Sequence, residues 1–407
     1  MKRQILFVWA IMLATVSFSQ QFEAPKIDGS KFEKLKVHVG GDFAMQFQGL
    51  SQSADSALIP LGKGLNLPTA NFTIDADLAP GIRVNLTTYL SSRHHNEAWV
   101  KGGYLLMDQL PFLNSAFFDN LMKYLTLKIG VMEVNYGDEH FRRSDNGNII
   151  NNPFVGNYIM DGFTTAPALE VMFRSNGWLA MVGTSTFDLK PALTGYGGGQ
   201  FTAYNMGNEL GAYGKVGFDK QFTDHFRLRA TVSALTVPKS HSISLYNGDR
   251  TGSRYYLVMN KESAGATAVD ITSGHTSGRW GPGGGIKKDN SIMANLFAKY
   301  YGLEFFGTFE SAKANKGGPD FTYTQFATEG LYRFGKQEQF YGGLRYNKVN
   351  NDQSMSVDRF QIDAGWKLTD NIIAKLEYVN QNYDNFLTDY GNNAGFKGIM
   401  FEAGISF

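Results

Sequence analysis

Strict alternation of apolar and polar residues, sustained over long runs, is the feature that most constrains the fold of this chain. Within residues 82–90, for example, Ile82, Val84 and Leu86 alternate with polar side chains such as Arg83. The same period of two marks residues 72–78, 226–232 and 360–368. Alternation of this kind predicts β-strands that have one apolar face and one polar face.

The lengths of these runs separate a membrane barrel from a soluble core. Strands of globular proteins average ~5–6 residues, whereas strands that cross a membrane need ~9–11. The chain repeatedly reaches the longer class, and its pattern predicts sixteen strands, at residues 36–50, 65–78, 82–92, 96–107, 124–134, 167–174, 178–187, 209–221, 226–236, 290–300, 302–312, 320–334, 340–350, 357–368, 371–381 and 397–407.

The connections between these runs alternate between short and long. Short turns rich in Gly, Asn and Asp follow residues 78, 174, 221, 300, 334 and 368. Longer polar stretches occur near residues 51–63, 135–166, 188–208, 237–289, 313–319, 351–356 and 382–396. Outer-membrane barrels have short periplasmic turns and long outer loops. We therefore expect an all-β fold: a transmembrane, antiparallel up-and-down β-barrel of about 16 strands with both termini in the periplasm.

The first residues predict export. Lys2 and Arg3 precede an apolar run at residues 5–16, and Ser17 and Ser19 supply the small residues before a cleavage site. This run is too short for a membrane anchor, because a spanning helix needs ~20 apolar residues. The pattern indicates a secretory signal peptide that is cut after Ser19. A lipoprotein anchor is excluded, because the chain has 0 cysteines.

Composition agrees with a barrel and excludes one class of partner. The chain has 46 Gly, 32 Phe and 20 Tyr, yet its mean hydropathy is only −0.25, as expected where lipid-facing and lumen-facing residues alternate. Its net charge of +1 gives no reason to expect nucleic acid as a partner. We expect a signal peptide at residues 1–19, a periplasmic N-terminal stretch at 20–35 and the barrel at 36–407, with a short periplasmic helix at 110–121.

Several stretches of the mature chain resemble those of a known group of proteins. They lie at residues 127–131, 136–140, 302–306, 331–335 and 377–381, and the last strand alternates up to a terminal Phe407. On these residues the chain resembles the porin superfamily of sixteen-stranded barrels, and within it the phosphate-selective porin group and its relatives in the Bacteroidetes. The resemblance implies a Gram-negative outer membrane, assembly as a trimer and a constriction formed by a loop that folds into the barrel.

The charges on the predicted lumen face depart from a phosphate-selective pattern. Alternation places ten basic residues inward, namely Arg83, Lys101, Lys128, Lys215, Arg227, Arg229, Arg345, Arg359, Lys367 and Lys375. It also places nine acidic residues inward, namely Asp42, Asp75, Asp77, Asp219, Glu304, Glu310, Asp363, Glu377 and Glu402. Such a balance does not predict a pore for phosphate alone. The charges either pair across neighbouring strands or set a transverse field at the narrow point, and both hypotheses stay open.

The loop at residues 135–167 is the candidate constriction. It combines charged residues with apolar ones such as Phe154 and Val155, which an exposed loop rarely needs. We expect part of it to pack inside the barrel, where rings of charged side chains bias ion passage; the alternatives are an outer cover or a trimer contact. The candidate pore-lining residues are Arg83, Lys128, His140, Arg142, Arg143, Asp145, Arg227, Arg229, Arg359, Asp363 and Glu377.

Motifs for other chemistry are weak. Residues 281–285 are glycine-rich but lack the Gly-Lys-Ser/Thr ending of a phosphate loop. Residues 145–148 lack the ligand series and closing Glu of a calcium loop. His94 and His95 are adjacent on a strand end and point to opposite faces, so they are poor joint ligands for a metal. No histidine has the spacing of a base beside a nucleophile, so we expect no enzyme, no metal and no cofactor.

These patterns predict an outer-membrane porin that allows passive diffusion of small hydrophilic solutes or ions, with weak charge selectivity. Its partners would be outer-membrane lipid, the solutes and either a homotrimer or a larger envelope complex. The alternative is a non-conducting structural or interaction barrel within such a complex. The two differ in whether a continuous polar path runs through the lumen.

Overall fold

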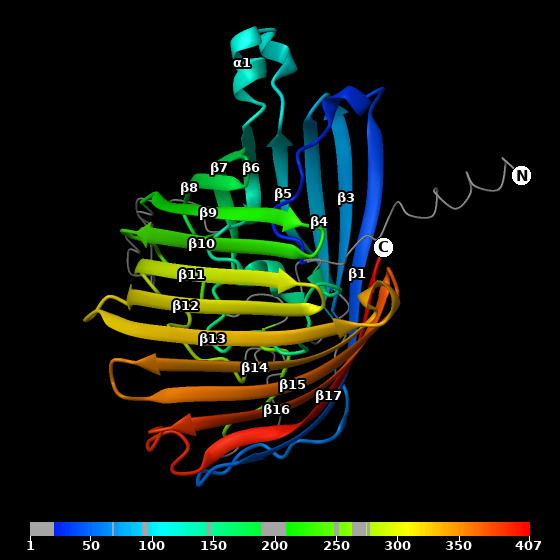
Figure 1. Cartoon of the computed structure of the whole chain (residues 1–407). Coiled ribbons are helices and arrows are strands. Elements are labelled where there is room, and N and C mark those ends of the chain that lie inside the picture. The colour runs from blue at the N-terminus through cyan, green and yellow to red at the C-terminus, as the bar shows by residue number, and fades with distance from the viewer. Residues whose placement is uncertain are drawn as a thin grey trace, which may run out of the picture.

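The computed structural model describes residues 20–66, 69–91, 97–144, 148–188, 209–247, 252–262, 274 and 277–407. Within these residues seventeen strands form one antiparallel sheet. Sixteen make a closed barrel (Figure 1), and the seventeenth, β2 (Gly64–Leu65), is a two-residue strand paired with β1. The barrel strands are β1 (Lys36–Ser53), β3 (Thr69–Ala79), β4 (Ile82–Ser91), β5 (Glu97–Met107), β6 (Leu125–Glu133), β7 (Thr165–Ser175), β8 (Trp178–Ser185), β9 (Gly211–Thr223), β10 (Phe226–Val237), β11 (Lys288–Tyr300), β12 (Leu303–Asn315), β13 (Phe321–Phe334), β14 (Phe340–Asn351), β15 (Ser356–Thr369), β16 (Ile372–Asp384) and β17 (Ala394–Ser406).

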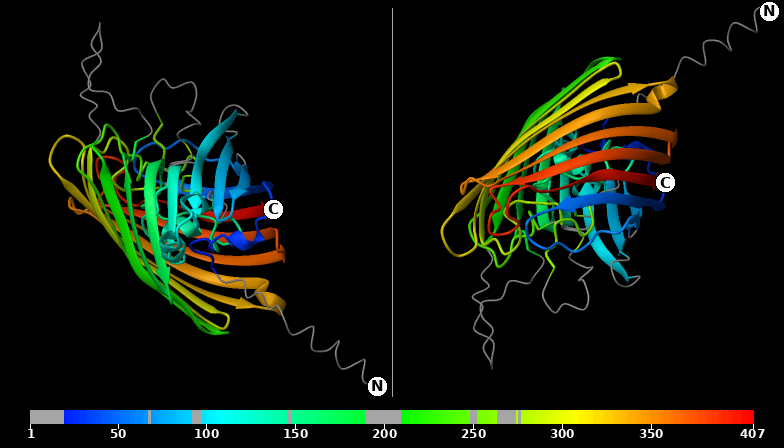
Figure 2. Two further views of the ribbon diagram at one scale, coloured as in Figure 1. Left: turned by 90° about the horizontal axis from the view of Figure 1, so that it is seen from above. Right: turned by 90° about the horizontal axis from the view of Figure 1, so that it is seen from below.

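The barrel closes through its first strand. The first half of β1 pairs with β3, from Lys36 to Ala44, and its second half pairs with β17, from Asp42 to Ser53. Each remaining barrel strand pairs with its neighbours in sequence, and all of these pairs are antiparallel. Figure 2 shows β17 lying beside β1. The predicted fold class, an up-and-down barrel of about 16 strands, is confirmed.

Strand lengths and turns agree with the sequence pattern. Of the barrel strands, only β8, with eight residues, is shorter than nine. The left-handed dihedral angles of Asn176 and Gly177, with φ of 50° and 88°, make the tight turn before β8. The helix expected at residues 110–121 consists of the 3-10 turn η3 (Pro111–Leu113) and α1 (Ala116–Leu121), which extends beyond the end of the barrel in Figure 1. No helix in the described residues is long and apolar enough to span a membrane.

The outer face of the barrel is apolar. Exposed side chains such as Leu296, Phe309 and Leu344 point away from the barrel in the middle of their strands. At the turn ends of β8 to β15 the aromatic rings contact one another in an almost continuous series: Trp178, Phe218, Phe222, Phe226, Tyr300, Tyr301 and, further along, Tyr332, Phe334, Phe340 and Trp366. An apolar band with an aromatic girdle at its edge is the surface that a lipid bilayer requires.

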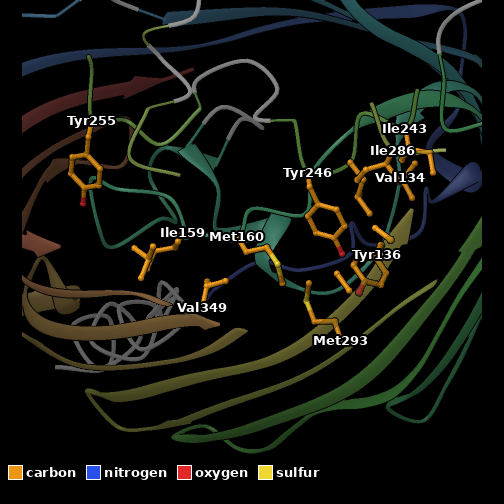
Figure 3. Close-up of a cluster of buried hydrophobic side chains, with 14 of the residues drawn as sticks. Val134, Tyr136, Ile159, Met160, Ile243, Tyr246, Tyr255, Ile286, Met293 and Val349 are labelled. Carbon is orange, nitrogen blue, oxygen red and sulfur yellow. The ribbon is translucent and has the colours of Figure 1, made fainter. Parts of the chain in front are cut away.

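The interior of the barrel contains a hydrophobic core of its own. Figure 3 shows Tyr136, Ile159 and Met160 of the segment between β6 and β7 beside Tyr246 and Ile286 of the segment between β10 and β11. All five side chains are buried. Much of the lumen is therefore filled by the chain's own loops, which pack against the wall as the core of a soluble protein does.

Candidate functional site

The loop between β6 and β7, residues 134–164, lies inside the barrel. Almost all its described residues are buried, which confirms the prediction of a loop folded into the lumen. Arg142 of this loop forms ion pairs with two strands of the wall. The guanidinium of Arg142 lies 3.1 Å from Glu304 on β12 and 2.6 Å from Glu329 on β13. All three side chains are completely buried. Ion pairs between loop and wall thus hold the loop in place.

Polar side chains of the wall hold the backbone of this loop. The amides of Val155 and Gly156 donate to a carboxylate oxygen of Glu377, at 2.9 and 3.2 Å. The Ile159 amide donates to Asn347 at 2.7 Å, in the same way. A buried loop without regular structure needs such partners, because unpaired backbone groups in a dry interior cost free energy. The inward polar residues of β14 and β16 therefore serve the loop rather than a solute.

Described residues of the segment between β10 and β11, residues 238–247, 252–262 and 277–287, fill a second part of the lumen. Tyr246 donates a hydrogen bond to Glu310 at 2.6 Å, and Tyr255 donates to Glu377 at 2.6 Å. Arg254 pairs with Glu402 at 2.5 Å. These described residues point inward, although the sequence pattern indicated only a long polar outer loop. The wall of β12, β16 and β17 is consequently covered on its inner face.

The N-terminal stretch, residues 20–35, also contributes to the filling. Gln20, Phe22 and Glu23 are buried or nearly so and contact side chains of the inward loop and of β10. The stretch was expected in the periplasm, but its first residues lie inside the barrel. The reason is that Phe22 and Glu23 match rings and cations, among them Phe297 and Arg229, that only the folded barrel brings together.

The described residues leave one side of the lumen uncovered. A cavity of about 240 Å³ lies against the inner faces of β1, β3, β4 and β5 and the ends of β6 and β7. Its lining is polar apart from a few aliphatic and aromatic side chains: Asp42, Asn71, Thr73, Asn85, Thr87, Lys101, Gly102, Tyr104, Lys128, Val131, Met132, Glu133 and Thr165. This cavity is the candidate functional site.

A ladder of polar side chains continues from this cavity along β3 and β4 toward the periplasmic end. Thr73 and Thr87 share a hydrogen bond of 3.2 Å, Asn85 donates to Asp75 at 2.9 Å, and Arg83 pairs with Asp77 at 2.7 Å. All six side chains are partly exposed. By contrast, the inward residues Arg345, Gln361 and Glu377 of β14 to β16 are at most 1% exposed. Within the described residues, water therefore reaches the wall mainly along β3 and β4.

The formal charges in the cavity are balanced. Its two carboxylates belong to Asp42 and Glu133, and its two ammonium groups belong to Lys101 and Lys128. The Lys128 ammonium lies 4.1 Å from the centre of the Tyr104 ring, on whose face a cation is stabilised. Opposite charges facing one small cavity set up a local field, and they leave no excess of either sign.

The structure brings only some of the predicted pore-lining residues to the cavity. Lys128 lines it, and Arg83 belongs to the ladder below it. His140 is buried behind it, where its ring contacts Glu133 and Asn135. Asp145 lies outside the described residues.

The other predicted pore-lining residues take part in packing. Those from the loop and β10 form ion pairs: Arg142 with Glu304 and Glu329, Arg143 with Asp161, Arg227 with Asp219, and Arg229 with Glu23 and Asp138. On the far wall, Arg359 donates to the backbone oxygens of Asn157 and Gly278, and Asp363 and Glu377 lie opposite each other in the pairing of β15 with β16. The charged residues of the loop and β10 are therefore paired with opposite charges, whereas Arg359 and Glu377 on the far wall bind the backbone of the inward segments.

Most residues that line the cavity were not among the predicted ones. Small polar residues such as Asn71, Thr73 and Thr87 share the inward face of β3 and β4, and alternation alone shows that they point inward. What the alternation does not show is which part of the wall the loops leave uncovered. The sequence pattern also does not show the bulge in the pairing of β4 with β5, where the register shifts between Thr87 and Thr88 of β4.

Comparison with solved structures finds a porin, a channel and a further protein of bacterial outer membranes. The anion-selective porin from Comamonas acidovorans has a TM-score of 0.55 and 11% identity, over 92% of this chain and 100% of that one. The channel DcaP of Acinetobacter baumannii has a TM-score of 0.55 and 11% identity, over 92% and 98% of the chains. A trimer form of OmpT from Vibrio cholerae has a TM-score of 0.50 and 10% identity, over 92% and 100%.

Sequence comparison alone gives no such likeness, since no protein-family model and no curated sequence matches the chain. The similarity to solved structures extends over nearly the whole chain. The chain therefore has the fold of the porins, the sixteen-stranded β-barrels of the bacterial outer membrane.

Proposed function

We propose that this protein is a passive outer-membrane channel for small hydrophilic solutes or ions, which pass along the β3 to β6 side of the lumen. The observation that carries the proposal is the contrast between the two halves of the wall. Polar side chains of β3 and β4 such as Thr73, Asn85 and Thr87 are partly exposed, whereas inward side chains of β14 to β16 are covered by loops. A barrel of ~16 strands is wide enough to hold both the loops and a water-filled path.

The charges support weak selectivity. The cavity holds two acidic and two basic side chains, so an ion of either sign meets attraction and repulsion at the same point. The resemblance to phosphate-selective porins would call for an excess of basic residues, and the cavity does not have one. We therefore propose a path for small polar solutes rather than for phosphate alone.

Replacement of Lys128 by glutamate tests this pathway. The change turns a balanced cavity into one with three acidic side chains and one basic. Two units of charge a few Å from a passing ion change its energy by about 1–2 kcal/mol in a wet site, and ~1.4 kcal/mol is tenfold in an equilibrium. We expect the cation-to-anion permeability ratio to rise about tenfold, measured as the reversal potential under a KCl gradient.

The matched control is Lys313→Glu, which makes the same charge change on an exposed side chain at the outer end of β12. Its permeability ratio should remain close to that of the unmodified channel, because exposed charges are screened over ~10 Å at 0.1 M salt. Equal shifts in the two variants would mean that ions do not pass beside Lys128.

The proposal includes export and assembly. We propose that residues 1–19 are removed, so that the intact mass of protein purified from membranes corresponds to a chain that begins at Gln20. A mass that retains these residues would contradict this. We also propose a homotrimer, supported by the fold and by the trimer form of OmpT, and a role without catalysis.

A second function is favoured by the extent of the filling. A barrel whose lumen is largely occupied by its own loops also suits a non-conducting structural component of an envelope complex. The two functions differ in conductance, because a structural barrel need not leave a continuous polar path.

A further inference from the structure

The N-terminal residues that enter the barrel form a segment with a defined binding site, and Gln20 makes its first contacts. The Gln20 side chain donates to the backbone oxygen of Phe141 at 3.0 Å and accepts from Arg142 at 3.0 Å. Its backbone oxygen accepts from Arg227 on β10 at 2.7 Å. Gln20 thus bridges the inward loop and the barrel wall, and only 2% of it is exposed.

Phe22 occupies a slot made of rings and cations. Its ring packs edge-on against Phe141 of the loop and Phe297 of β11, with centroid distances of 5.6 and 5.3 Å. The guanidinium groups of Arg227 and Arg229 lie 5.2 and 4.2 Å from its centre. Ring faces stabilise desolvated cations, so the slot selects an aromatic side chain.

Glu23 completes the site as a carboxylate. Both its oxygens accept from Arg229, at 2.6 and 2.8 Å, and Lys215 lies 3.8 Å away. Burial acts to raise the pKa of Glu23, but the charges of Arg229 and Lys215 outweigh it and hold the pKa below its usual value. A two-point contact between a guanidinium and a carboxylate is among the strongest hydrogen-bonded pairs in proteins.

The residues that follow fix the segment at the periplasmic end. Arg174 donates to the backbone oxygen of Ala24 at 2.6 Å, and Asp108 accepts the Ile27 amide at 2.8 Å while facing Lys26 at 3.5 Å. Beside Glu23 lies a cavity of about 290 Å³, lined by Glu23, Arg174, Ser175, Asn176, Gly177, Trp178, Leu179, Asp219 and Arg229. This space adjoins the β7–β8 turn, so the segment can leave its site toward the periplasm without crossing the packed core.

We propose that the lumen contains a binding site for an aromatic-acidic peptide, formed by Arg229, Lys215 and the Phe22 slot, and that the chain's own residues 20–26 occupy it as a displaceable plug. The segment closes the periplasmic half of the lumen beside β9 and β10 and supports the inward loop through Arg142. Its removal leaves a vacant site of matching shape, in which Arg229 and Lys215 lose Glu23 and keep Asp138 as their shared carboxylate. The effect on conductance rests on the proposed channel function, whereas the binding site does not.

The test uses a variant in which residues 20–26 are deleted directly after the signal peptide, and a synthetic peptide of those seven residues. The purified barrel, checked for folding by circular dichroism, is titrated with fluorescently labelled peptide. We expect saturable binding to the truncated barrel and none to the unmodified one, whose site is occupied. A peptide with glutamine in place of Glu23 should bind on the order of tenfold more weakly, because it loses the charged hydrogen bonds to Arg229.

Full-length variants guard against a truncated barrel that fails to fold. Glu23→Gln, which removes the carboxylate but keeps the shape, should allow measurable binding of the added peptide. Glu33→Gln, the same change at an exposed position of the stretch, should not. In planar bilayers the truncated channel should conduct about twofold more than the unmodified one or better, and added peptide should reverse the gain.

The outcomes are separable. A folded truncated barrel that does not bind the peptide, or Glu23→Gln and Glu33→Gln variants that behave alike, would overturn the plug and its site. Peptide binding without conductance in any variant would leave the site standing and would contradict the proposed channel function instead.

Discussion

Replacement of Arg142 by alanine should lower the free energy of unfolding by about 1.5–3 kcal/mol, the usual contribution of buried hydrogen bonds to charged groups. The guanidinium is fully buried between Glu304 and Glu329. Arg333 still faces Glu304 at 2.9 Å, and Arg345 still faces Glu329 at 2.7 Å, so each carboxylate keeps one cation and loses the other. Urea unfolding in lipid vesicles, followed by tryptophan fluorescence, measures the loss.

The matched control is Arg83→Ala. Arg83 also pairs with a carboxylate, at 2.7 Å from Asp77, but its side chain is 36% exposed. Exposed ion pairs contribute about 0–1 kcal/mol, so this variant should unfold almost as the unmodified barrel does. If both variants lost the same free energy, the inward loop would not be held by Arg142 in the way the structure shows.

Replacement of Leu296 by arginine should cost about 2–4 kcal/mol, the penalty for a charge at the bilayer midplane on the lipid face of a barrel. Leu296 lies in the middle of β11 and points outward, and 43% of it is exposed. The same unfolding measurement applies.

Leu387→Arg is the control for this substitution, because Leu387 is 62% exposed in the loop between β16 and β17. Surface changes away from special features stay within about 0.5 kcal/mol. A small loss at Leu296 would show that this face of β11 does not meet hydrocarbon, and it would contradict the membrane barrel.

The strands could be predicted from the sequence because the membrane imposes one rule on all of them. In β11 and β15 each outward residue meets lipid and each inward residue meets the interior, so a period of two persists over 13 and 14 residues. The turns follow from local chemistry, as Asn176 and Gly177 show. Strand ends differ from the predicted ones by a few residues in both directions, since β1 continues to Ser53 and β3 begins only at Thr69. Backbone pairing, rather than hydropathy, sets these ends.

The site could be predicted only in part. Alternation correctly places Arg359 and Glu377 inward, but it does not tell an inward residue that meets water from one that meets a loop. That distinction depends on contacts between residues far apart in the chain, such as Glu377 with the Val155 amide. The apolar residues of the inward loop did predict its insertion, because exposure of side chains such as Phe154 and Val155 to water is unfavourable.

The position of Gln20 to Glu23 could not be read from the sequence either. This stretch has no periodic pattern, and its partners, among them Arg229 and Phe297, converge only when the barrel closes. A short segment with one aromatic ring and one carboxylate does not by itself predict a binding site, because its partners come from distant parts of the chain. The same holds for the cavity, whose outline is set by what the loops leave free.

The solute path is tested most directly by a single cysteine in place of Thr87, which lines the cavity. The chain has 0 cysteines of its own. Single-channel conductance is recorded in planar bilayers before and after a charged, thiol-specific reagent is added. We predict stable conducting steps that fall sharply on modification of Thr87→Cys and do not change in the unmodified protein. Folded, inserted protein without conducting steps, or steps that persist after complete modification, would contradict a solute path along β3 and β4.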